Sequence, residues 1–442
     1  MSTIEPQDNE GKKTMTRRQL LASVGAAGVL LAAGAGLPVK VQAAKSTVPV
    51  TDNKPWYNVK DFGAVGEGLY DDDAPYIQAA IDAAASKGGT VYFPPGSYCI
   101  NRGIIMRSKV HLLGAGAEVT ELKAGDTNLL MLFSGGGVGS YSIDGITFSG
   151  RGPSGATGDI VERGIHMLEG SHITISRCIF TDSANGVRLV RSRHVTVTDC
   201  TFLRILGSES PAEGFGIVLE GGSNHIIKGN HFKNVTKSCI CLNAGSSYSL
   251  ISNNVMEQCQ DAAILMSSKL SACSYHLIEG NLVTSEGLQE SASSSTYGIR
   301  LKDACSNNTI VNNVITRPEK GGIQLEAGDN AGDDRPYGNT ITGNTVNGTI
   351  CGIAVINGDA NSVKHNEVRR VQTGILLNTA GEGGSSSAKR NVVTGNSLYQ
   401  CSVAAVKIAS AQCESNSVFG NAGYENAEGL ADSGTNTATA GF

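Results

Sequence analysis

Gly298-Ile299-Arg300-Leu301 and Gly322-Ile323-Gln324-Leu325 are two copies of one phrase: a small residue, then a hydrophobic, a variable and a second hydrophobic residue. Other copies begin at Gly164, Gly186, Gly216, Gly352 and Gly374, and degenerate copies begin at Cys239, Ala263 and Ala405. The intervals of about 22 to about 35 residues lie in the period range of stacked solenoid coils. Each phrase alternates apolar and polar positions, as a strand does when successive side chains point in and out. The repeat therefore predicts short parallel strands stacked along a solenoid.

A second phrase follows each copy of the first and places Cys or Asn two residues before a hydrophobic residue. Its members are Cys178, Cys200, Asn230, Asn254, Asn281, Asn313, Asn344, Asn366, Asn396 and Asn416. Recurring Asn at one register predicts a ladder of side-chain amides bonded from coil to coil, and the two Cys are expected to begin the same inward stack. Gly, Asn, Ser and Asp separate the phrases and favour turns. We therefore expect an all-β parallel β-helix of about ten coils.

The first 55 residues precede the repeats. Thr16-Arg17-Arg18-Gln19-Leu20-Leu21 opens an uncharged stretch that ends near Leu37, and Val41-Gln42-Ala43 is a small-residue cleavage pattern. This arrangement is typical of a twin-arginine signal peptide, which directs export from a bacterial cytoplasm. We expect a signal peptide at 1–43, a linker at 44–55, one β-helix domain at 56–426 and a flexible tail at 427–442, with no stable membrane insertion after cleavage.

Residues 56–98 differ from the repeats and contain a helix-like segment. The acidic cluster Asp71–Asp73 can cap a helix that starts near Pro75. Its apolar stripe is Ile77, Ala80, Ile81 and Ala84. Because the end of a solenoid exposes unpaired strand edges, we expect this amino-terminal helix to cap the first coil.

The stretch from Asp61 to Tyr98 resembles the amino-terminal motif of the pectate-lyase-like β-helix superfamily, whose pattern runs DFGAxGDGxxDD, IQxAID and GGxVxFPxGxY. Glu67 stands where the pattern has Asp. The resemblance implies a right-handed parallel β-helix related to polygalacturonase-like, rhamnogalacturonan-active and mannuronan C5-epimerase proteins. It also implies a polysaccharide partner, but it does not identify the reaction.

Two specific catalytic signatures of that superfamily are missing. The epimerase motif Asp-Pro-His-Glu has no counterpart, because the two possible registers read Arg188-Leu189-Val190-Arg191 and Val218-Leu219-Glu220-Gly221. Of the polygalacturonase motifs, only Arg300-Leu301-Lys302 resembles the last one. Neither of those two activities is therefore expected.

The third and fifth positions of each phrase are expected to point outward and to form columns from coil to coil. Most of both columns is chemically inert. The polar exception on two adjacent coils consists of Arg300, Lys302, Asp303, Gln324 and Glu326. Long insertions flank it at Ser285–Tyr297 and Ala327–Tyr337, so a linear glycan could lie across the coils between them. A second, fainter polar group comprises His166, Arg188 and Glu220.

These residues suggest two kinds of chemistry. Lys302 as general base and Arg300 as the group that neutralises a uronate carboxylate would give β-elimination. Asp303 and Glu326 as paired carboxylates would give hydrolysis. We expect Gln324, His166, Arg188 and Glu220 to contact substrate. The structural alternative is an exposed ion-pair ladder between Lys302 and Glu326.

Charge and cysteine content limit the partners. The formal net charge of −5, without a basic run beyond the signal, argues against nucleic acid. Eleven cysteines, an odd number, are expected to be mainly reduced packing residues, with one or two bridges left open. Asp329, Asp333 and Asp334 leave open a calcium ion, although their spacing matches no known loop. No other cofactor is indicated, and the chain is expected to be a monomer or a homotrimer.

Two functions follow from the sequence. The first is a secreted enzyme that cleaves or modifies an acidic glycan, with a lyase favoured over a hydrolase. The second is a noncatalytic glycan-binding or cell-envelope β-helix protein. The residues themselves do not decide between them.

Overall fold

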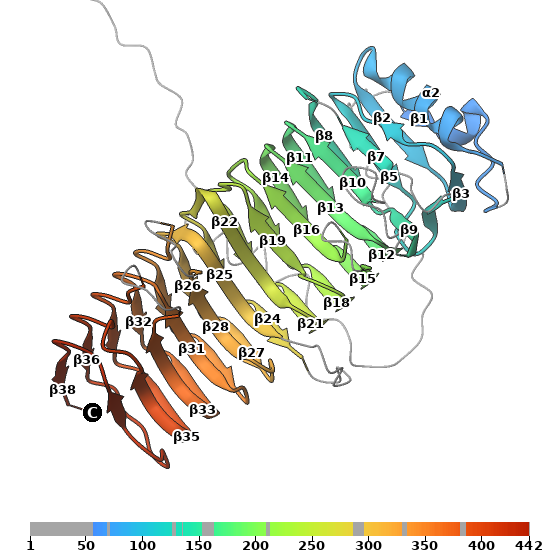
Figure 1. Ribbon diagram of the computed structural model, residues 1–442. Helices are drawn as coiled ribbons and strands as arrows, with labels where there is room; N and C mark the ends of the chain where they lie inside the picture. The colour runs from blue at the N-terminus through green and yellow to red at the C-terminus, as the bar shows by residue number, and fades with distance from the viewer. Residues whose placement is uncertain are drawn as a thin grey trace, which may run out of the picture. The chain divides into compact units, whose positions relative to one another are not determined.

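The computed structural model of the 442-residue chain describes residues 56–68, 71–125, 130–134, 136–152, 163–208, 213–285, 296–328, 334–380 and 386–441. The expected signal peptide and linker lie outside these residues. The described part is a stack of coils that runs from a helix at one end to the strand β38 at the other (Figure 1).

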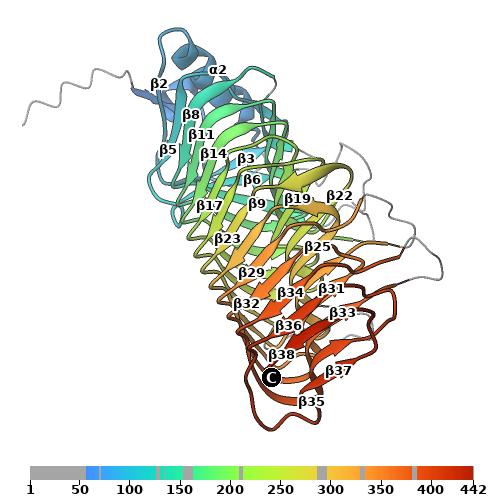
Figure 2. The ribbon, with the colours of Figure 1, turned by 90° about the vertical axis from the view of Figure 1, so that its left-hand side faces the viewer.

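Each coil contributes strands to three parallel sheets. Sheet 1 consists, in order, of β1 (Trp56–Asn58), β2 (Gly89–Phe93), β5 (Val110–Gly114), β8 (Gly139–Asp144), β11 (Ser171–Ser176), β14 (Arg193–Thr198), β17 (Ile226–Lys228), β20 (Leu250–Ser252), β23 (Leu277–Glu279), β26 (Thr309–Val311), β29 (Thr340–Thr342), β32 (Ser362–Lys364), β34 (Val392–Thr394), β36 (Ser417–Phe419) and β38 (Ala438–Ala440). Figure 2 shows many of these strands in a row along one side of the stack.

Sheet 2 contains the Gly-hydrophobic phrases. Its strands are β4 (Ile104–Ile105), β7 (Leu130–Ser134), β10 (Arg163–Leu168), β13 (Asn185–Val190), β16 (Phe215–Glu220), β19 (Ile240–Asn243), β22 (Ala262–Ser274), β25 (Tyr297–Ser306), β28 (Gly321–Glu326), β31 (Cys351–Ile356), β33 (Glu367–Asn378), β35 (Ser397–Ile408) and β37 (Leu430–Asp432). Every pairing is parallel, with each coil hydrogen-bonded to the next.

Sheet 3 forms the remaining side of the coil. It consists of β3 (Gly96–Ile100), β6 (Thr120–Ala124), β9 (Thr147–Gly152), β12 (Ile179–Ser183), β15 (Thr201–Ile205), β18 (His231–Val235), β21 (Val255–Cys259), β24 (Leu282–Thr284), β27 (Val314–Thr316), β30 (Thr345–Asn347) and the first parts of the bent strands β33 and β35. The predicted all-β, right-handed parallel β-helix with an amino-terminal capping helix is confirmed.

The capping helix α2 spans Ala74–Ala85 and follows the short 3-10 helix η2 (Val59–Phe62). Asp72 caps it, since its Oδ1 accepts the Ala74 N–H at 3.1 Å. Asp73 does something different: its buried carboxylate accepts N–H groups of Val65 and Gly66 in the Gly-rich turn and of Cys99 in the first coil. The acidic cluster therefore both caps the helix and fastens it to the coil below.

Residues 427–441, assigned to a tail from the sequence, contain two further strands. β37 pairs with β35 through Leu430 opposite Val406, and β38 pairs with β36 through Thr439 opposite Val418. The regular coil structure thus extends beyond residue 426.

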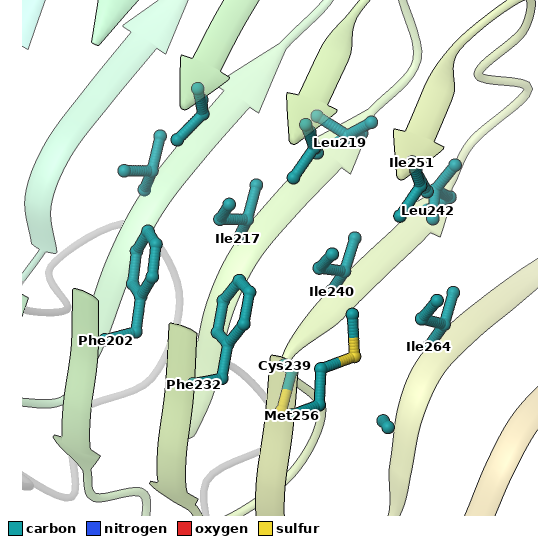
Figure 3. Close-up of a cluster of buried hydrophobic side chains, with 14 of the residues drawn as sticks. Phe202, Ile217, Leu219, Phe232, Cys239, Ile240, Leu242, Ile251, Met256 and Ile264 are labelled. Atoms are coloured by element: carbon teal, nitrogen blue, oxygen red, sulfur yellow. The ribbon is translucent and has the colours of Figure 1, made fainter. Parts of the chain in front are cut away.

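The core is a set of side-chain rows that run along the stack. Phe148, Phe180, Phe202 and Phe232 are fully buried, and successive rings stack with centroids 5.0, 4.8 and 4.6 Å apart. Met256 continues the row in the next coil (Figure 3). Because one side chain type occupies the same place in several coils, the cross-section stays constant along the helix.

The glycine that opens each phrase is required by close packing rather than by its backbone angles. A Cβ on Gly322 would lie 2.6 Å from the Gly352 carbonyl oxygen of the next coil and 2.3 Å from Val346 Cγ1. A Cβ on Gly186 would likewise clash with a carbonyl oxygen of the next coil, that of Gly216, and with a core side chain, the Phe202 ring. Gly therefore recurs at the positions where the backbones of two neighbouring coils are too close for a side chain.

The amide ladder is present, and it is double. One ladder joins Asn230, Asn254, Asn281, Asn313, Asn344, Asn366, Asn396 and Asn421, each amide donating to the next at 2.9–3.0 Å. A second ladder joins Asn308, Asn339, Asn361, Asn391 and Asn416. Asn416 was therefore assigned to the wrong ladder, because both phrases place Asn before a short strand. The predicted cysteines do begin the first ladder, since the Cys200 N–H donates to Asn230 Oδ1.

All eleven cysteines have free thiols, and nine of them are buried. Two histidines extend the second ladder toward the amino terminus: His276 N–H donates to Asn308 Oδ1, and His276 Nδ1 accepts the Ser249 N–H. Ser249 Oγ accepts the N–H of His225. Burial lowers the pKa of both His225 and His276 to about 4, so both rings are neutral near pH 7.

Candidate functional site

The third positions of the phrases form one continuous column on the outer face of sheet 2, as predicted. In register from coil to coil it reads His166, Arg188, Val218, Cys241, Leu265, Arg300, Gln324, Ala354, Leu376 and Lys407. The strands that carry it lie side by side in Figure 1. Apart from Lys407 at the far end, its polar members fall into two groups, one centred on Arg300 and one on Arg188.

Arg300 is the centre of the first group. Its guanidinium contacts Glu326 Oε1 through Nη2 at 2.6 Å and through Nε at 2.9 Å. On the other side, Nη1 lies 3.6 Å from Asp261 Oδ1. The guanidinium carbon also lies 4.3 Å from the centre of the Tyr297 ring, a cation–π contact. One cation is therefore held by two carboxylates and one aromatic ring.

Glu326 has two partners in this group, because the Gln324 amide donates to its second oxygen. Lys302 lies directly opposite Glu326 in register, yet Arg300 forms the ion pair with that carboxylate. Within the described ranges, no ion pair or side-chain hydrogen bond engages the Lys302 amine. A diagonal ion pair between Arg300 and Glu326 thus replaces the expected ladder between Lys302 and Glu326. The Lys302 amine is therefore available to contact a ligand.

Asp303 does not join this group. It lies within β25, opposite Ser268 in register, with φ of 60°, and only 8% of it is exposed. No hydrogen bond or ion pair brings it to Glu326 among the residues that the structure describes. The second carboxylate beside Arg300 is Asp261 instead, which sequence reasoning missed together with Tyr297. Asp261 directly precedes β22 and Tyr297 is the first residue of β25, whereas only the third and fifth positions of the phrases were compared.

Burial changes the acidity of both missed residues. It raises the pKa of the Asp261 carboxyl above its usual value, with Arg300 opposing the shift. It also raises the pKa of the Tyr297 hydroxyl, so this phenol keeps its proton at neutral pH. The group therefore combines an ionised Arg, an available Lys amine, a protonated phenol and two unequal carboxylates, which are the components of acid–base chemistry on a glycosidic bond.

The second group contains an ion pair of the same diagonal geometry. Arg188 Nε donates to Glu220 Oε2 at 2.9 Å, from a third position to the fifth position of the next coil. His166 lies in register with Arg188 and is 8% exposed. Nearby in sequence, the fully buried Glu213 accepts the N–H and hydroxyl of Ser208. Structure thus brings together all three residues predicted for this group.

A family model described as "Rhamnogalacturonase A/epimerase, pectate lyase-like" matches residues 56–280, about half of the chain. The chain belongs to this family. A second model, described as "Periplasmic copper-binding protein (NosD)", matches residues 288–385. The earlier resemblance to the pectate-lyase-like superfamily is thereby confirmed at the level of the family.

Relatives of this rhamnogalacturonase/epimerase-like chain match it over short stretches. Mannuronan C5-epimerase AlgE2 of Azotobacter vinelandii is 51% identical over 78 residues, covering 16% of this chain and 8% of the relative. Alginate lyase 7 of the same organism is 40% identical over 109 residues, covering 22% and 13%. The chain thus spans only a small part of these curated relatives.

Similarity in fold to a solved structure extends over much more of the chain than these sequence matches do. The A-module of the A. vinelandii mannuronan C-5 epimerase AlgE6 superposes with a TM-score of 0.58, covering 87% of this chain and 99% of the module at 20% identity. At that identity the likeness establishes the β-helix fold alone.

Of the three aspartates that left open a calcium ion, Asp329 and Asp333 lie outside the described residues. Within the described residues, no group of three or more His, Cys, Asp and Glu side chains is arranged to bind a metal ion. The described helices include none long and apolar enough to span a bilayer.

Proposed function

We propose that this rhamnogalacturonase/epimerase-like chain acts on an acidic polysaccharide outside the cytoplasm, at the outer face of sheet 2 around Arg300. The observation that carries this proposal is the placement of the Arg300 guanidinium between Glu326, Asp261 and the Tyr297 ring, with Lys302 two residues further along the same strand. The similarity to mannuronan epimerases and an alginate lyase supports a glycan as the substrate class.

β-Elimination is the reaction we favour. The uronate carboxylate would take the place of Asp261 beside Arg300, and the guanidinium would neutralise its charge. Asp261 is the partner displaced because its contact with Arg300, at 3.6 Å, is longer than the contact of Glu326. Lys302 would remove the C5 proton, and the Tyr297 phenol would donate a proton to the departing glycosidic oxygen. The C5–H and C4–O bonds break, a C4–C5 double bond forms, and each proton has an assigned donor or acceptor.

Hydrolysis is the second candidate, and the raised pKa of Asp261 favours it. A carboxyl whose pKa is raised is suited to be the general acid, with Glu326 as the second carboxylate. Both carboxylates contact one guanidinium, so their separation is at most about 9 Å, within the range of about 5 to 9.5 Å for glycosidase pairs. In this reaction Asp261 takes the place that the sequence had given to Asp303.

The test is to incubate the purified protein with uronate-containing glycans and to follow two products. Ultraviolet absorbance of an unsaturated uronate would identify a lyase, and reducing ends without that absorbance would identify a hydrolase. Lys302→Ala should abolish the first activity, and Asp261→Asn should abolish the second.

The matched control is Lys407→Ala, which removes a lysine from the same column at its far end. Full activity of Lys302→Ala, Asp261→Asn and Glu326→Ala would refute the proposed site. Glycan binding without either product would support the noncatalytic function instead.

A further inference from the structure

An open cavity of about 230 Å³ lies on the outer face of sheet 1, close to the capping helix. It is lined by Thr90, His111, Leu112, Leu113, Ser142 and Asp144, which belong to β2, β5 and β8. Figure 2 shows these three strands together beside α2. The cavity is on a different side of the coil from the Arg300 group and many coils away from it, so it is a separate feature.

The polar groups of the cavity are held in fixed positions. His111 Nδ1 and Ser142 Oγ are 2.9 Å apart, and the two residues are opposite each other in register. The Asp144 carboxylate accepts the Ser176 hydroxyl at 3.1 Å and also pairs with Arg177. An imidazole, a hydroxyl and an oriented carboxylate within one shallow cavity are the groups that proteins use to bind sugar hydroxyls.

Two aromatic side chains border the cavity on the amino-terminal side. Tyr92 is opposite the lining residue Leu113, and Trp56 is opposite the lining residue Thr90. The two rings meet edge to face, with centroids 5.9 Å apart. Trp56 is the single tryptophan of the chain and is 62% exposed. A large aromatic surface left in water next to a polar cavity indicates a binding surface rather than a core position.

The spacing of these groups fits two successive sugar rings. Parallel strands are about 4.8 Å apart, so Trp56 on β1 lies two strands, or about 10 Å, from His111 on β5. We propose that this cavity binds a neutral disaccharide unit of a glycan. One pyranose ring occupies the space between His111 and Asp144, and the next ring lies against Tyr92 and Trp56.

The charge of the lining selects a neutral sugar over a uronate. Asp144 contributes a carboxylate, which accepts hydroxyl donors but repels a second carboxylate. Its cationic neighbour Arg177 is already engaged with it. The site therefore differs in chemistry as well as in place from the face of sheet 2, and it would retain glycan on the protein without cleaving it.

The experiment uses the fluorescence of the single tryptophan. The purified protein is titrated with cellobiose and mannobiose, and in parallel with a diuronate. We expect a saturable change in Trp56 emission with at least one neutral disaccharide, with a Kd on the order of 1 mM. The diuronate should give no saturable change.

Three variants locate the site. His111→Ala and Ser142→Ala should each weaken binding at least about fivefold, as expected for loss of a sugar hydrogen bond. Thr196→Ala, two coils further along the same row, should bind like the parent. Circular dichroism checks that each variant is folded, and having two cavity variants prevents one misfolded protein from deciding the result.

The proposal would be overturned by no saturable response, by a response to the diuronate alone, or by parental affinity in both cavity variants. It is distinguishable from the proposed activity of sheet 2. Arg300→Ala should keep the fluorescence response while losing glycan turnover, whereas His111→Ala should weaken the fluorescence response.

Discussion

Arg300 and Glu326 pair diagonally between neighbouring coils: the guanidinium lies 2.6 Å from Glu326 Oε1, although Gln324 is the residue opposite Arg300 in the sheet. Arg188 and Glu220 repeat this relationship four strands away. Two ion pairs of the same geometry thus lie on one face, and the first has the Tyr297 ring and the Asp261 carboxylate beside it.

These matched pairs allow a direct comparison. Glu326→Gln and Glu220→Gln should each lower the free energy of unfolding by about 1 to 3 kcal/mol, the usual contribution of a hydrogen bond to a charged group. Glycan turnover should fall at least about 100-fold in Glu326→Gln and less than about threefold in Glu220→Gln. Urea unfolding and a turnover assay measure the two effects. Equal losses of turnover would show that the Arg300 group has no special role.

The glycines of the phrase can be tested by adding a single methyl group. Gly322→Ala should destabilise the protein by about 1 to 3 kcal/mol, because its Cβ would clash with the Gly352 carbonyl and with Val346. Gly328→Ala is the matched control, since a Cβ there has nothing within 4 Å. Thermal unfolding of both variants gives the answer. If Gly322→Ala were as stable as the control, close packing would not explain the repeat.

Interruption of the amide ladder should strongly lower the free energy of unfolding. Asn313 accepts the backbone N–H and the amide of Asn281 and donates to the Ile278 carbonyl and to Asn344, all inside the core. Asn313→Ala leaves several buried groups without partners and should cost about 3 to 5 kcal/mol. Thr340→Ala, on the outer face of sheet 1, should cost less than about 1 kcal/mol. Chemical denaturation tests this, and a small loss for Asn313→Ala would mean that water replaces the missing amide.

Stability should depend on pH through His225 and His276. Their pKa of about 4 in the folded protein lies below the ordinary value of 6.5, so the unfolded chain binds more protons between these values. The stabilisation is therefore complete above about pH 6.5 and is lost as the pH falls toward 4. At pH 5 each histidine should cost about 1 to 2 kcal/mol relative to pH 7.

The measurement is a series of urea midpoints from pH 7.5 to pH 4.5, a range chosen around the roughly 6.5-to-4 window of the two rings. His276→Asn should flatten this dependence, because Asn is the residue that the rest of the ladder uses and it does not titrate. Thr340→Ala, on the outer face of sheet 1, changes no titratable group and is the control that should leave the slope unchanged. A parent protein with no loss between pH 7 and pH 5 would contradict the assigned environment.

The sequence predicted most of the architecture because the coils repeat. Equivalent residues meet equivalent neighbours, so one phrase identifies the strand, its inward positions and its outward column, as the register of Arg188, Arg300 and Gln324 shows. The two amide ladders were confused at Asn416 because both place the same residue before a short strand, and spacing alone does not separate them.

The candidate site was predicted only in part. Arg300, Gln324 and Glu326 were found because they share a column, and the structure brings them into contact. Asp261 and Tyr297 were missed because they stand just before the phrases, and only the third and fifth positions of each phrase were aligned. Asp303 follows the fifth position of its phrase, and the alternation of β25 turns it inward, so it lies apart from the outward column that holds Glu326.

The regular stacking of coils also fixes a length scale. Arg188 and Arg300 stand in one column on strands four steps apart, which at about 4.8 Å per step places them about 19 Å from each other. Removal or insertion of one whole coil between them would change that distance only in increments of a single strand spacing. The number of coils between two chemical groups on this face therefore sets the distance between them. That distance can be altered by changing the number of repeats without redesigning either group.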